Sequence, residues 1–414
     1  MHWWENEFTK VRGNRLELAG VDAMGLAKRH GTPLYVYGKR RILARFEELK
    51  DLLADLTPLE TRVCFAMKAN PHTGILKALR GAAAWIDAVS PNEVRTAMAA
   101  GFPATRILFT GTSVSTADLR AAFSIPGLTV NIDAAEQLEL MREVRDAAFR
   151  GRKIRVSVRW NPGIGRGFNP KAVTAGERSA DGTPIKFGVE ESKVVSVFQR
   201  AKKLGFLPVG LHQHLGSGWV REDYPTVRRA VDRMVRRAAD LRGLGFRLEF
   251  LDFGGGFGPR YSQGQHLFPV ADYLRYVCGK VRKSGLDIKA MAFEPGKYLV
   301  GDAGALLLGV SYIKESYGNL FACVDGGTFN TVPRPAIYMQ AHHEIVNCLE
   351  VDGTKKARIT VAGHLCETGD VFGKERPMPR PERGGLLAVL GAGGYCRSMA
   401  SNFNLRDIPK EILI

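Results

Sequence analysis

From about residue 60 to residue 294, the sequence alternates short β-branched or aromatic runs with longer stretches of helical spacing. The eight runs that we predict to be strands cover residues 63–67, 85–89, 106–110, 128–132, 154–160, 209–214, 248–253 and 291–294. The helices predicted between most of them cover residues 72–80, 92–100, 116–124, 134–149, 191–204, 223–243 and 271–284. This α/β alternation requires a parallel sheet, and the count of eight favours a closed (β/α)8 TIM barrel. An open, doubly wound sheet is the alternative, but no G-x-G-x-x-G motif follows the first strand.

The alternation stops near residue 297, and short apolar runs separated by turn residues follow at 320–324, 344–351, 357–361 and 386–390. This pattern is typical of an all-β domain, either a β-barrel or a sandwich. Strand-like pieces at 8–18 and 34–37 are expected to join that domain. We therefore predict a barrel over residues 38–292 and a β-domain built from residues 1–37 and 293–414.

One connection within the predicted barrel is unusual. Residues 161–188, between the fifth and sixth strands, are rich in glycine, proline and charged residues. The segment is too long for an ordinary barrel loop, so we interpret it as a lid or a binding loop.

The chain is basic, with 59 Lys and Arg against 42 Asp and Glu and a formal net charge of +17, which raises the question of an anionic partner. The densest basic run, residues 221–247, holds eight arginines, and apolar residues recur within it at helical spacing. No series of aromatic residues alternates with these arginines, as a surface that stacks on bases would need. We interpret the run as an amphipathic helix with a solvated basic face and expect no nucleic-acid partner.

Cysteine usage and the N-terminus indicate a soluble, cytoplasmic protein. The six cysteines form no C-x-x-C pair and no zinc spacing, which favours reduced thiols (positions 64, 278, 323, 348, 366 and 396). The first residues lack the basic and apolar regions of a signal peptide. The longest apolar stretch, around 303–310, is far shorter than the ~20 residues that span a bilayer, so we expect no membrane partner.

Barrel enzymes carry their chemistry at the C-terminal ends of the strands, so the residues at those ends are candidates. Lys68 ends the first strand, where partial burial would lower its pKa towards that of a usable nucleophile; a lysine that merely extends from the barrel rim is the alternative. His212 and His214 end the sixth strand, before Gly216 and Ser217. A metal pair is conceivable there, but no third ligand of matching spacing follows. We therefore expect no metal, and favour a histidine that packs on a planar ring beside a phosphate loop.

The seventh and eighth strands end in an anion-binding pattern and in an acid. Gly254, Gly255 and Gly256 free their N–H groups to approach a phosphate, although a tight turn alone would also use them. Glu294, held by a Pro-Gly turn, could pair with a ring nitrogen, and an ordinary strand-end acid is the alternative. An aldehyde for the lysine, a phosphate for the glycines, a stacked ring and a basic ring nitrogen together describe pyridoxal 5'-phosphate.

The motifs at these positions resemble those of the barrel-type (fold type III) pyridoxal-phosphate amino-acid decarboxylases, and most closely the branch that acts on diaminopimelate. The resemblance runs over nearly the whole chain. It rests on residues 66–70 (AMKAN), 214–217 (HLGS), 254–256 (GGG), 294–296 (EPG), 334–338 (RPAIY), 366–370 (CETGD), Tyr395 and 398–402 (SMASN).

The resemblance implies a role for each residue. Lys68 would form the covalent link to the cofactor, His214 would stack on its ring and Glu294 would bind its ring nitrogen. The cofactor phosphate would be held by Ser217, Gly254, Gly255, Gly256 and Tyr395, and Asp87 would complete the cofactor site. The substrate's distal carboxylate and amino group would be recognised by Lys297, Arg334, Tyr338, Glu367 and Tyr395.

The same resemblance implies the reaction and the assembly. Cys366 would donate the proton that replaces CO₂; a small buried apolar residue is the alternative reading of a lone cysteine. The segment that carries Cys366 reaches the active site across a dimer interface in this family, so a homodimer with shared sites is implied. The implied reaction converts meso-2,6-diaminopimelate to L-lysine.

Departures from the family pattern keep other substrates open. Lys297 stands where an arginine is usual, and residues 87–93 have Pro-Asn where two glycines are usual. Ornithine-type enzymes carry an acid that binds a terminal ammonium at the position of Met339. Arg334 favours a carboxylate instead, so a diacid diamine fits better than ornithine or lysine. Alanine racemases share this architecture but place an arginine opposite the ring nitrogen, which weakens the ring as an electron acceptor. Glu294 at that position favours decarboxylation. Diaminobutyrate, ornithine, lysine, arginine or a specialised amino acid remain alternative substrates, and a non-catalytic cofactor-binding homologue is the remaining alternative.

Overall fold

A computed structural model describes residues 1–338 and 340–414. Met339, used above in the argument against an ornithine-type substrate, lies outside the described residues. The chain forms two compact units. Unit 1 comprises Met1–Arg45, Pro259–Gln265 and Lys297–Ile414, and unit 2 comprises Phe46–Gly258 and His266–Gly296.

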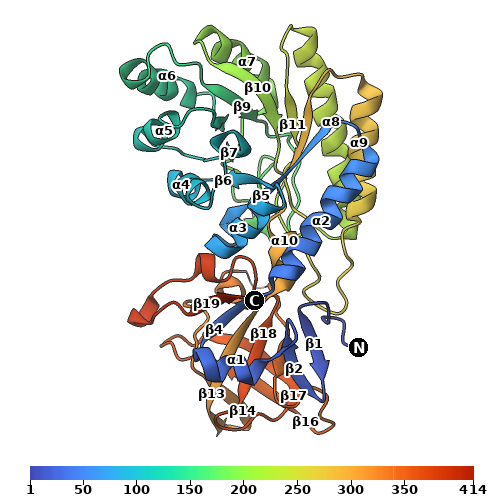
Figure 1. The fold of residues 1–414 in the computed structure, drawn as a ribbon, viewed down its shortest axis with the longest axis vertical. Helices are drawn as coiled ribbons and strands as arrows, with labels where there is room; N and C mark the ends of the chain where they lie inside the picture. Colours follow the sequence, from blue (N-terminus) through green and yellow to red (C-terminus); the bar gives the residue numbers. More distant parts are fainter. Residues whose placement is uncertain (339) are drawn as a thin grey trace. The chain divides into compact units, whose positions relative to one another are not determined.

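Unit 2 is a closed barrel of parallel strands, which confirms the predicted fold (Figure 1). Its strands are β5 (Glu60–Ala66), β6 (Trp85–Ala88), β7 (Ile107–Phe109), β8 (Thr129–Ile132), β9 (Arg155–Arg159), β10 (Leu207–His212), β11 (Phe250–Asp252) and β12 (Ala290–Phe293). Each strand pairs with the next along the chain, and β12 pairs with β5 to close the ring. These strands are almost entirely buried, as parallel strands covered on both faces must be.

Helices follow most of the strands and surround them, as Figure 1 shows. They are α3 (Thr73–Gly81), α4 (Pro91–Ala99), α5 (Thr116–Phe123), α6 (Gln137–Ala148), α7 (Val194–Lys203), α8 (Tyr224–Gly243) and α9 (Val270–Ser284). A further helix, α2 (Lys39–Leu56), precedes the first barrel strand and was not predicted. Helix α8 is the arginine-rich segment. It buries Val227, Val231 and Met234 and exposes Arg228 and Arg236, as the amphipathic interpretation requires.

The barrel interior changes in character along the strands. Apolar side chains from five strands form one cluster, which contains Cys64, Leu108, Val209, Phe250, Ala290 and Ala292. Buried polar side chains lie from the middle of the strands to just beyond their carboxyl ends, namely Asp87, Asn131, Ser157, His212, Asp252 and Glu294. Because parallel strands all end on the same rim of a barrel, this rim is the polar one.

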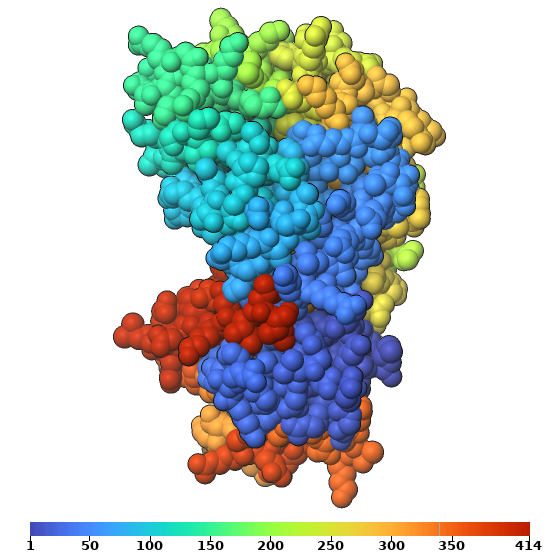
Figure 2. Space-filling view, viewed as in Figure 1, coloured from blue at the N-terminus to red at the C-terminus, as the bar shows by residue number. Residues whose placement is uncertain are grey.

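Unit 1 is built mainly on a mixed sheet. Strands β15 (Ile345–Asn347), β18 (Leu386–Leu390), β13 (Gly304–Ser316), β14 (Asn319–Val324), β16 (Lys356–Ala362) and β17 (Val371–Pro379) follow one another across it. The N-terminal strand β4 (Leu34–Tyr37) pairs with both β13 and the C-terminal strand β19 (Lys410–Leu413), so both chain ends join this sheet. Figure 2 shows the blue N-terminal and red C-terminal segments next to one another at its surface.

The remaining elements of unit 1 include a three-stranded sheet of β1 (Thr9–Arg12), β2 (Arg15–Leu18) and β3 (Val21–Asp22), with helix α1 (Ala23–His30) after it. Asp22 caps the N-terminus of α1, and its carboxylate accepts a hydrogen bond from the Gly25 N–H at 2.9 Å. No helix within residues 1–338 and 340–414 is both long and apolar enough to cross a membrane.

Candidate active site

Lys68 lies directly after β5, in the short helical turn Met67–Ala69. Its Nζ contacts Asp87 Oδ2, and the other oxygen of Asp87 accepts a hydrogen bond from the Thr110 hydroxyl. Asp87 is fully buried, whereas the Lys68 side chain keeps 32% of its surface exposed. The lysine is therefore held at its amine by a buried acid while part of the side chain stays accessible.

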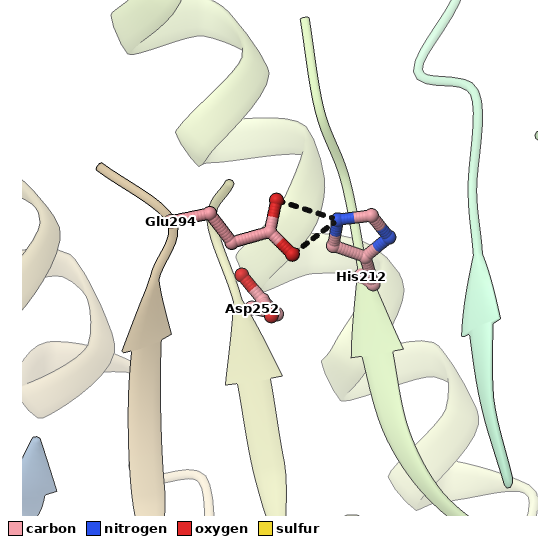
Figure 3. A group of neighbouring side chains, drawn as sticks. All are labelled: His212, Asp252 and Glu294. Atoms are coloured by element: carbon pink, nitrogen blue, oxygen red, sulfur yellow. Dashed lines mark hydrogen bonds and ion pairs between the residues drawn. The ribbon is translucent and has the colours of Figure 1, made fainter. Parts of the chain in front are cut away.

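Glu294, His212 and Asp252 form a buried group at the ends of three neighbouring strands (Figure 3). His212 Nε2 lies 3.3 Å from Glu294 Oε1 and 3.4 Å from Oε2. One atom of each residue lies within 4.8 Å of one atom of each of the others. The three side chains come from three separate strands, so the residue spacing along any one strand did not predict that they would meet.

The charges in this group are divided unequally between the two acids. Burial raises the pKa of Glu294, but the neighbouring His212, which donates a hydrogen bond to it, and the charge of Lys68 lower that pKa well below its usual value. Burial raises the pKa of Asp252 to about 8, and the neighbouring Glu294 charge contributes to that increase. Glu294 is therefore the ionised acid at neutral pH, and Asp252 holds a proton.

Asp252 makes the stability of this chain depend on pH. Its pKa in the folded state exceeds that of an unfolded aspartate, so the free energy of unfolding falls as the pH rises from about 4 to about 8, and the loss is complete above that range. Asp252→Asn should keep the acceptor for the Gly254 N–H, which lies 2.9 Å from Oδ1, and remove the titration. Thermal midpoints at about pH 5 and pH 9 should differ less in this variant than in wild type. The exposed Asp51→Asn is the control, and an undiminished pH dependence in Asp252→Asn would contradict the assignment.

His214 follows β10 and is held by the backbone of residues 254–256, the glycine segment. Its Nδ1 accepts a hydrogen bond from the Gly255 N–H at 3.2 Å and lies 3.8 Å from Glu294 Oε2. Burial lowers the pKa of His214 to about 3, so the ring is neutral. At Gly255 a Cβ atom would lie 2.1 Å from the carbonyl oxygen of Glu294. The absence of a side chain there therefore allows two strand ends to approach closely.

The long connection 161–188 binds the segment that contains Ser217. The Ser217 N–H donates to Ala172 O at 3.0 Å, and the Phe168 N–H donates to Ser217 O at 2.9 Å. The Thr174 hydroxyl donates to the carbonyl oxygen of His214 at 2.9 Å. The loop therefore positions the backbone on which Ser217 and His214 stand.

A second group of candidate residues lies in unit 1. Arg334 begins the short helix α11 (Arg334–Ile337) and is buried. His343 Nδ1 lies 2.9 Å from the carbonyl oxygen of Leu390, which can only accept, so Nδ1 carries the proton and Nε2 is an acceptor. Arg334 Nη1 lies 3.2 Å from that Nε2, and its guanidinium lies 4.5 Å from the centre of the Tyr261 ring. His343 and Tyr261 therefore hold the guanidinium of Arg334 on two sides.

The other residues predicted to recognise the substrate or the phosphate are also in unit 1. Lys297 begins α10 (Lys297–Val300), and burial, together with the charge of Arg334, lowers the pKa of its amine well below the usual value. Its Nζ lies 5.4 Å from the centre of the Tyr395 ring. Tyr338 is half-buried at the end of α11. The structure thus brings Lys297, Arg334 and Tyr395 into one neighbourhood.

Cys366 and Glu367 are exposed in unit 1, on a loop anchored by buried residues on both sides. Asp370 Oδ2 accepts the Leu365 N–H at 2.7 Å, and Oδ1 accepts the Thr328 N–H at 2.5 Å. Asn404 donates from Nδ2 to Cys366 Sγ at 3.1 Å and accepts the Cys366 N–H at 3.0 Å. The exposure of Cys366 contradicts the alternative reading of a small buried core residue.

Several residues that complete these groups were not among the predicted site residues. His212 and Asp252 lie near the carboxyl ends of predicted strands and end the observed strands β10 and β11, and that position was the signal that could have identified them. His343 had no such signal, because its neighbours Arg334 and Leu390 are distant in sequence.

The barrel residues fit a pyridoxal cofactor. Among the described residues, the buried Glu294 Oε1 accepts no hydrogen bond, because the hydrogen bond from His212 goes to Oε2, and a protonated ring nitrogen would satisfy Oε1. Lys68 offers the amine that an aldehyde requires, and the neutral ring of His214 lies beside Glu294. The donor set therefore suits a basic, ring-shaped aldehyde.

Comparison with known proteins agrees with this chemistry. Residues 39–301 match the family described as pyridoxal-dependent decarboxylase, pyridoxal binding domain. Diaminopimelate decarboxylase from Methanothermobacter thermautotrophicus is 37% identical over 404 residues, which cover 96% of this chain and 90% of that protein. The enzyme of the same name from Pseudomonas aeruginosa is 35% identical over 97% of this chain and 92% of its own length.

Solved structures lead to the same family. The crystal structure of diaminopimelate decarboxylase from Helicobacter pylori complexed with L-lysine superposes with a TM-score of 0.86 at 29% identity, and the match covers 95% of this chain and 94% of that one. The match extends through both units, since it covers nearly the whole of each chain. This chain belongs to the pyridoxal-dependent decarboxylases.

Proposed function

We propose that this chain is a pyridoxal phosphate-dependent decarboxylase that converts meso-2,6-diaminopimelate to CO₂ and L-lysine. The observation that carries the proposal is the buried, ionised Glu294 beside His212, on the same barrel rim as the Lys68–Asp87 pair. Full-length relatives named diaminopimelate decarboxylase support the substrate. When bound, the cofactor supplies an electron-withdrawing ring that accepts the electron pair released as CO₂ departs.

In the barrel, Lys68 is the covalent attachment point, and Asp87 orients its Nζ. Glu294 would hold a proton on the ring nitrogen of the cofactor, and the neutral ring of His214 would pack on the cofactor ring. We assign the cofactor phosphate to Ser217, to Tyr395 and to the N–H groups of Gly254, Gly255 and Gly256.

In unit 1, Arg334 recognises the distal carboxylate of the substrate with Lys297 and Tyr338, and Glu367 recognises the distal amino group. Cys366 donates a proton from Sγ to the carbon that has lost CO₂. Because Cys366 and Glu367 are exposed in the isolated chain, we place them at the site of a second subunit in a homodimer with shared sites. Reduced thiols at all six cysteines support a cytoplasmic location.

A CO₂-release screen tests the proposed reaction. The purified chain with added cofactor should release CO₂ from meso-diaminopimelate and form L-lysine in equal amount. Release only from ornithine, lysine, arginine or 2,4-diaminobutyrate would reject the substrate while preserving the reaction class. A chain that binds the cofactor and releases no CO₂ from any of these would be a non-catalytic homologue.

Arg334→Ala should raise the KM for diaminopimelate by about 10- to 150-fold, because a hydrogen-bonded ion pair contributes roughly 1.5–3 kcal/mol. Arg334→Lys should recover only part of this loss, since an ammonium group lacks the planar fork of a guanidinium. Initial-rate kinetics give both values. Arg236→Ala, on the exposed face of α8, is the matched control. If Arg334→Ala has the same KM as wild type, Arg334 does not recognise the substrate.

Mixing inactive subunits tests the shared sites. If Lys68 and Cys366 at one site come from different subunits, a mixture of Lys68→Ala and Cys366→Ala chains should regain roughly a quarter of wild-type activity, because half of the dimers carry one intact site. Each variant alone, taken through the same subunit exchange, is the control. No recovery despite demonstrated exchange would indicate that each site belongs to one chain.

A further inference from the structure

We propose that His212 is a positioning residue that orients Glu294 and keeps it the ionised member of the acid pair. This inference rests on the proposed function, in which Glu294 binds the ring nitrogen of the cofactor. It adds to that site a residue of β10, which is separated from β12 by β11, and it gives a role to the buried polar network that contacts His212.

The network crosses three neighbouring strands of the barrel. Ser157 on β9 donates from its hydroxyl to Asn131 Oδ1 on β8 at 2.7 Å, and Asn131 Nδ2 lies 3.0 Å from His212 Nδ1 on β10. His212 Nε2 then reaches both oxygens of Glu294, as the dashed lines in Figure 3 show. All four side chains are buried, so each contact is shielded from water.

The direction of these hydrogen bonds determines where His212 carries its proton. Because the Ser157 hydroxyl occupies the amide oxygen of Asn131, the amide nitrogen faces His212 and donates to Nδ1. Nδ1 is then an acceptor, and the proton of His212 lies on Nε2, which is the nitrogen that faces Glu294. His212 therefore presents a donor to the carboxylate, and the ring cannot rotate without losing Asn131.

This donor decides which of two neighbouring acids is charged. Asp252 and Glu294 are both buried and repel each other when both are ionised. His212 favours the charge on Glu294, whereas Asp252 Oδ2 has no hydrogen-bond partner among the described residues. Without His212, the proton would be shared between the two acids. A protonated Glu294 would no longer hold a proton on the ring nitrogen.

A purely structural role is the competing explanation, since a buried histidine must have its hydrogen bonds satisfied wherever it lies. The two explanations differ in what a conservative replacement can restore. Glutamine is long enough to place an amide N–H near the Nε2 position. Asparagine ends near the Nδ1 position and can contact only Asn131, and leucine can do neither.

The experiment compares His212→Gln, His212→Asn and His212→Leu as holoenzymes, with the exposed His266→Gln as control. Measurements are the visible absorbance of the bound cofactor as a function of pH, the Kd for pyridoxal phosphate, kcat, KM and the thermal midpoint. Leucine and asparagine should shift the absorbance, weaken cofactor binding about tenfold or more and lower kcat by about 10²-fold, with little change in KM. Glutamine should restore most of the spectrum and of kcat.

The outcomes separate this inference from the proposed function. Glu294→Gln serves as the benchmark: if it leaves the spectrum and kcat unchanged, the role of Glu294 in the proposed function fails. If Glu294→Gln is impaired but all three His212 variants behave like wild type, the inference about His212 is overturned alone. Equal impairment of glutamine and asparagine variants with normal thermal midpoints also overturns it. If the leucine variant does not fold, the comparison of glutamine with asparagine decides.

Discussion

Lys68→Ala is expected to yield a colourless protein whose decarboxylation rate is at least about 10³-fold below that of wild type. The variant removes the amine that attaches the cofactor and leaves the buried Asp87 without its cation. Absorbance between about 300 and 500 nm, where the bound cofactor absorbs, reports its attachment, and CO₂ release reports turnover.

Two further variants identify the cause of that loss. Lys68→Arg keeps a positive charge beside Asp87 but offers no amine for attachment, so it should be as inactive as Lys68→Ala and more stable. Lys77→Ala removes an exposed lysine of α3 and should match wild type. A yellow, active Lys68→Ala protein would disprove the covalent role of this lysine.

Cys366→Ala should keep the cofactor spectrum and lose about 10²- to 10⁴-fold in turnover, the contribution typical of a positioned proton donor. Cys366 is exposed and its loop is anchored by the buried Leu365 and Asp370, so alanine should not disturb the fold. Its thiol is also held by Asn404, and Asn404→Ala should cause a smaller loss in the same direction.

Thiol variants elsewhere provide the comparison. Cys323→Ala, on β14, removes a thiol that has no proposed role and should leave turnover unchanged. Single-turnover CO₂ release in wild type and in Cys366→Ala separates the loss of CO₂ from the later protonation. Unchanged steady-state turnover in Cys366→Ala would assign the proton to another group.

The barrel was predictable because its strands are short, largely buried runs rich in β-branched, aromatic or other apolar residues, and most of them are separated by longer helical stretches. Helix α2 was missed because it precedes the first strand, where no alternation had begun. Strand β17 was missed because its sequence, VFGKERPMP, contains two prolines and three charged residues and lacks a period of two. Strand β13 begins as an apolar run and ends in exposed residues, so only its pairing with three other strands defines its length.

The candidate site was predictable in part for a related reason. In a parallel barrel every strand ends on the same rim, so Lys68, His214 and Glu294 could be grouped from their positions after predicted strands. The partners that control their charges could not be grouped in this way. Asn131 faces His212 across two strand pairings, and His343 meets Arg334 in a turn region with no periodic signal.

Local patterns in the sequence determined the order of strands and helices, the reactive side chains at the strand ends and the amphipathic basic helix. Periodicity and side-chain chemistry are properties of residues that are close together in the chain, so they can be recognised without the fold. Which acid is ionised was decided only by the tertiary structure. The pairing of β10 with β11 sets His212 opposite Asp252, and β12 then brings Glu294 to the same rim. Burial and Coulomb interactions depend on distance in space, so the charges of these three groups exist as a property of the folded barrel.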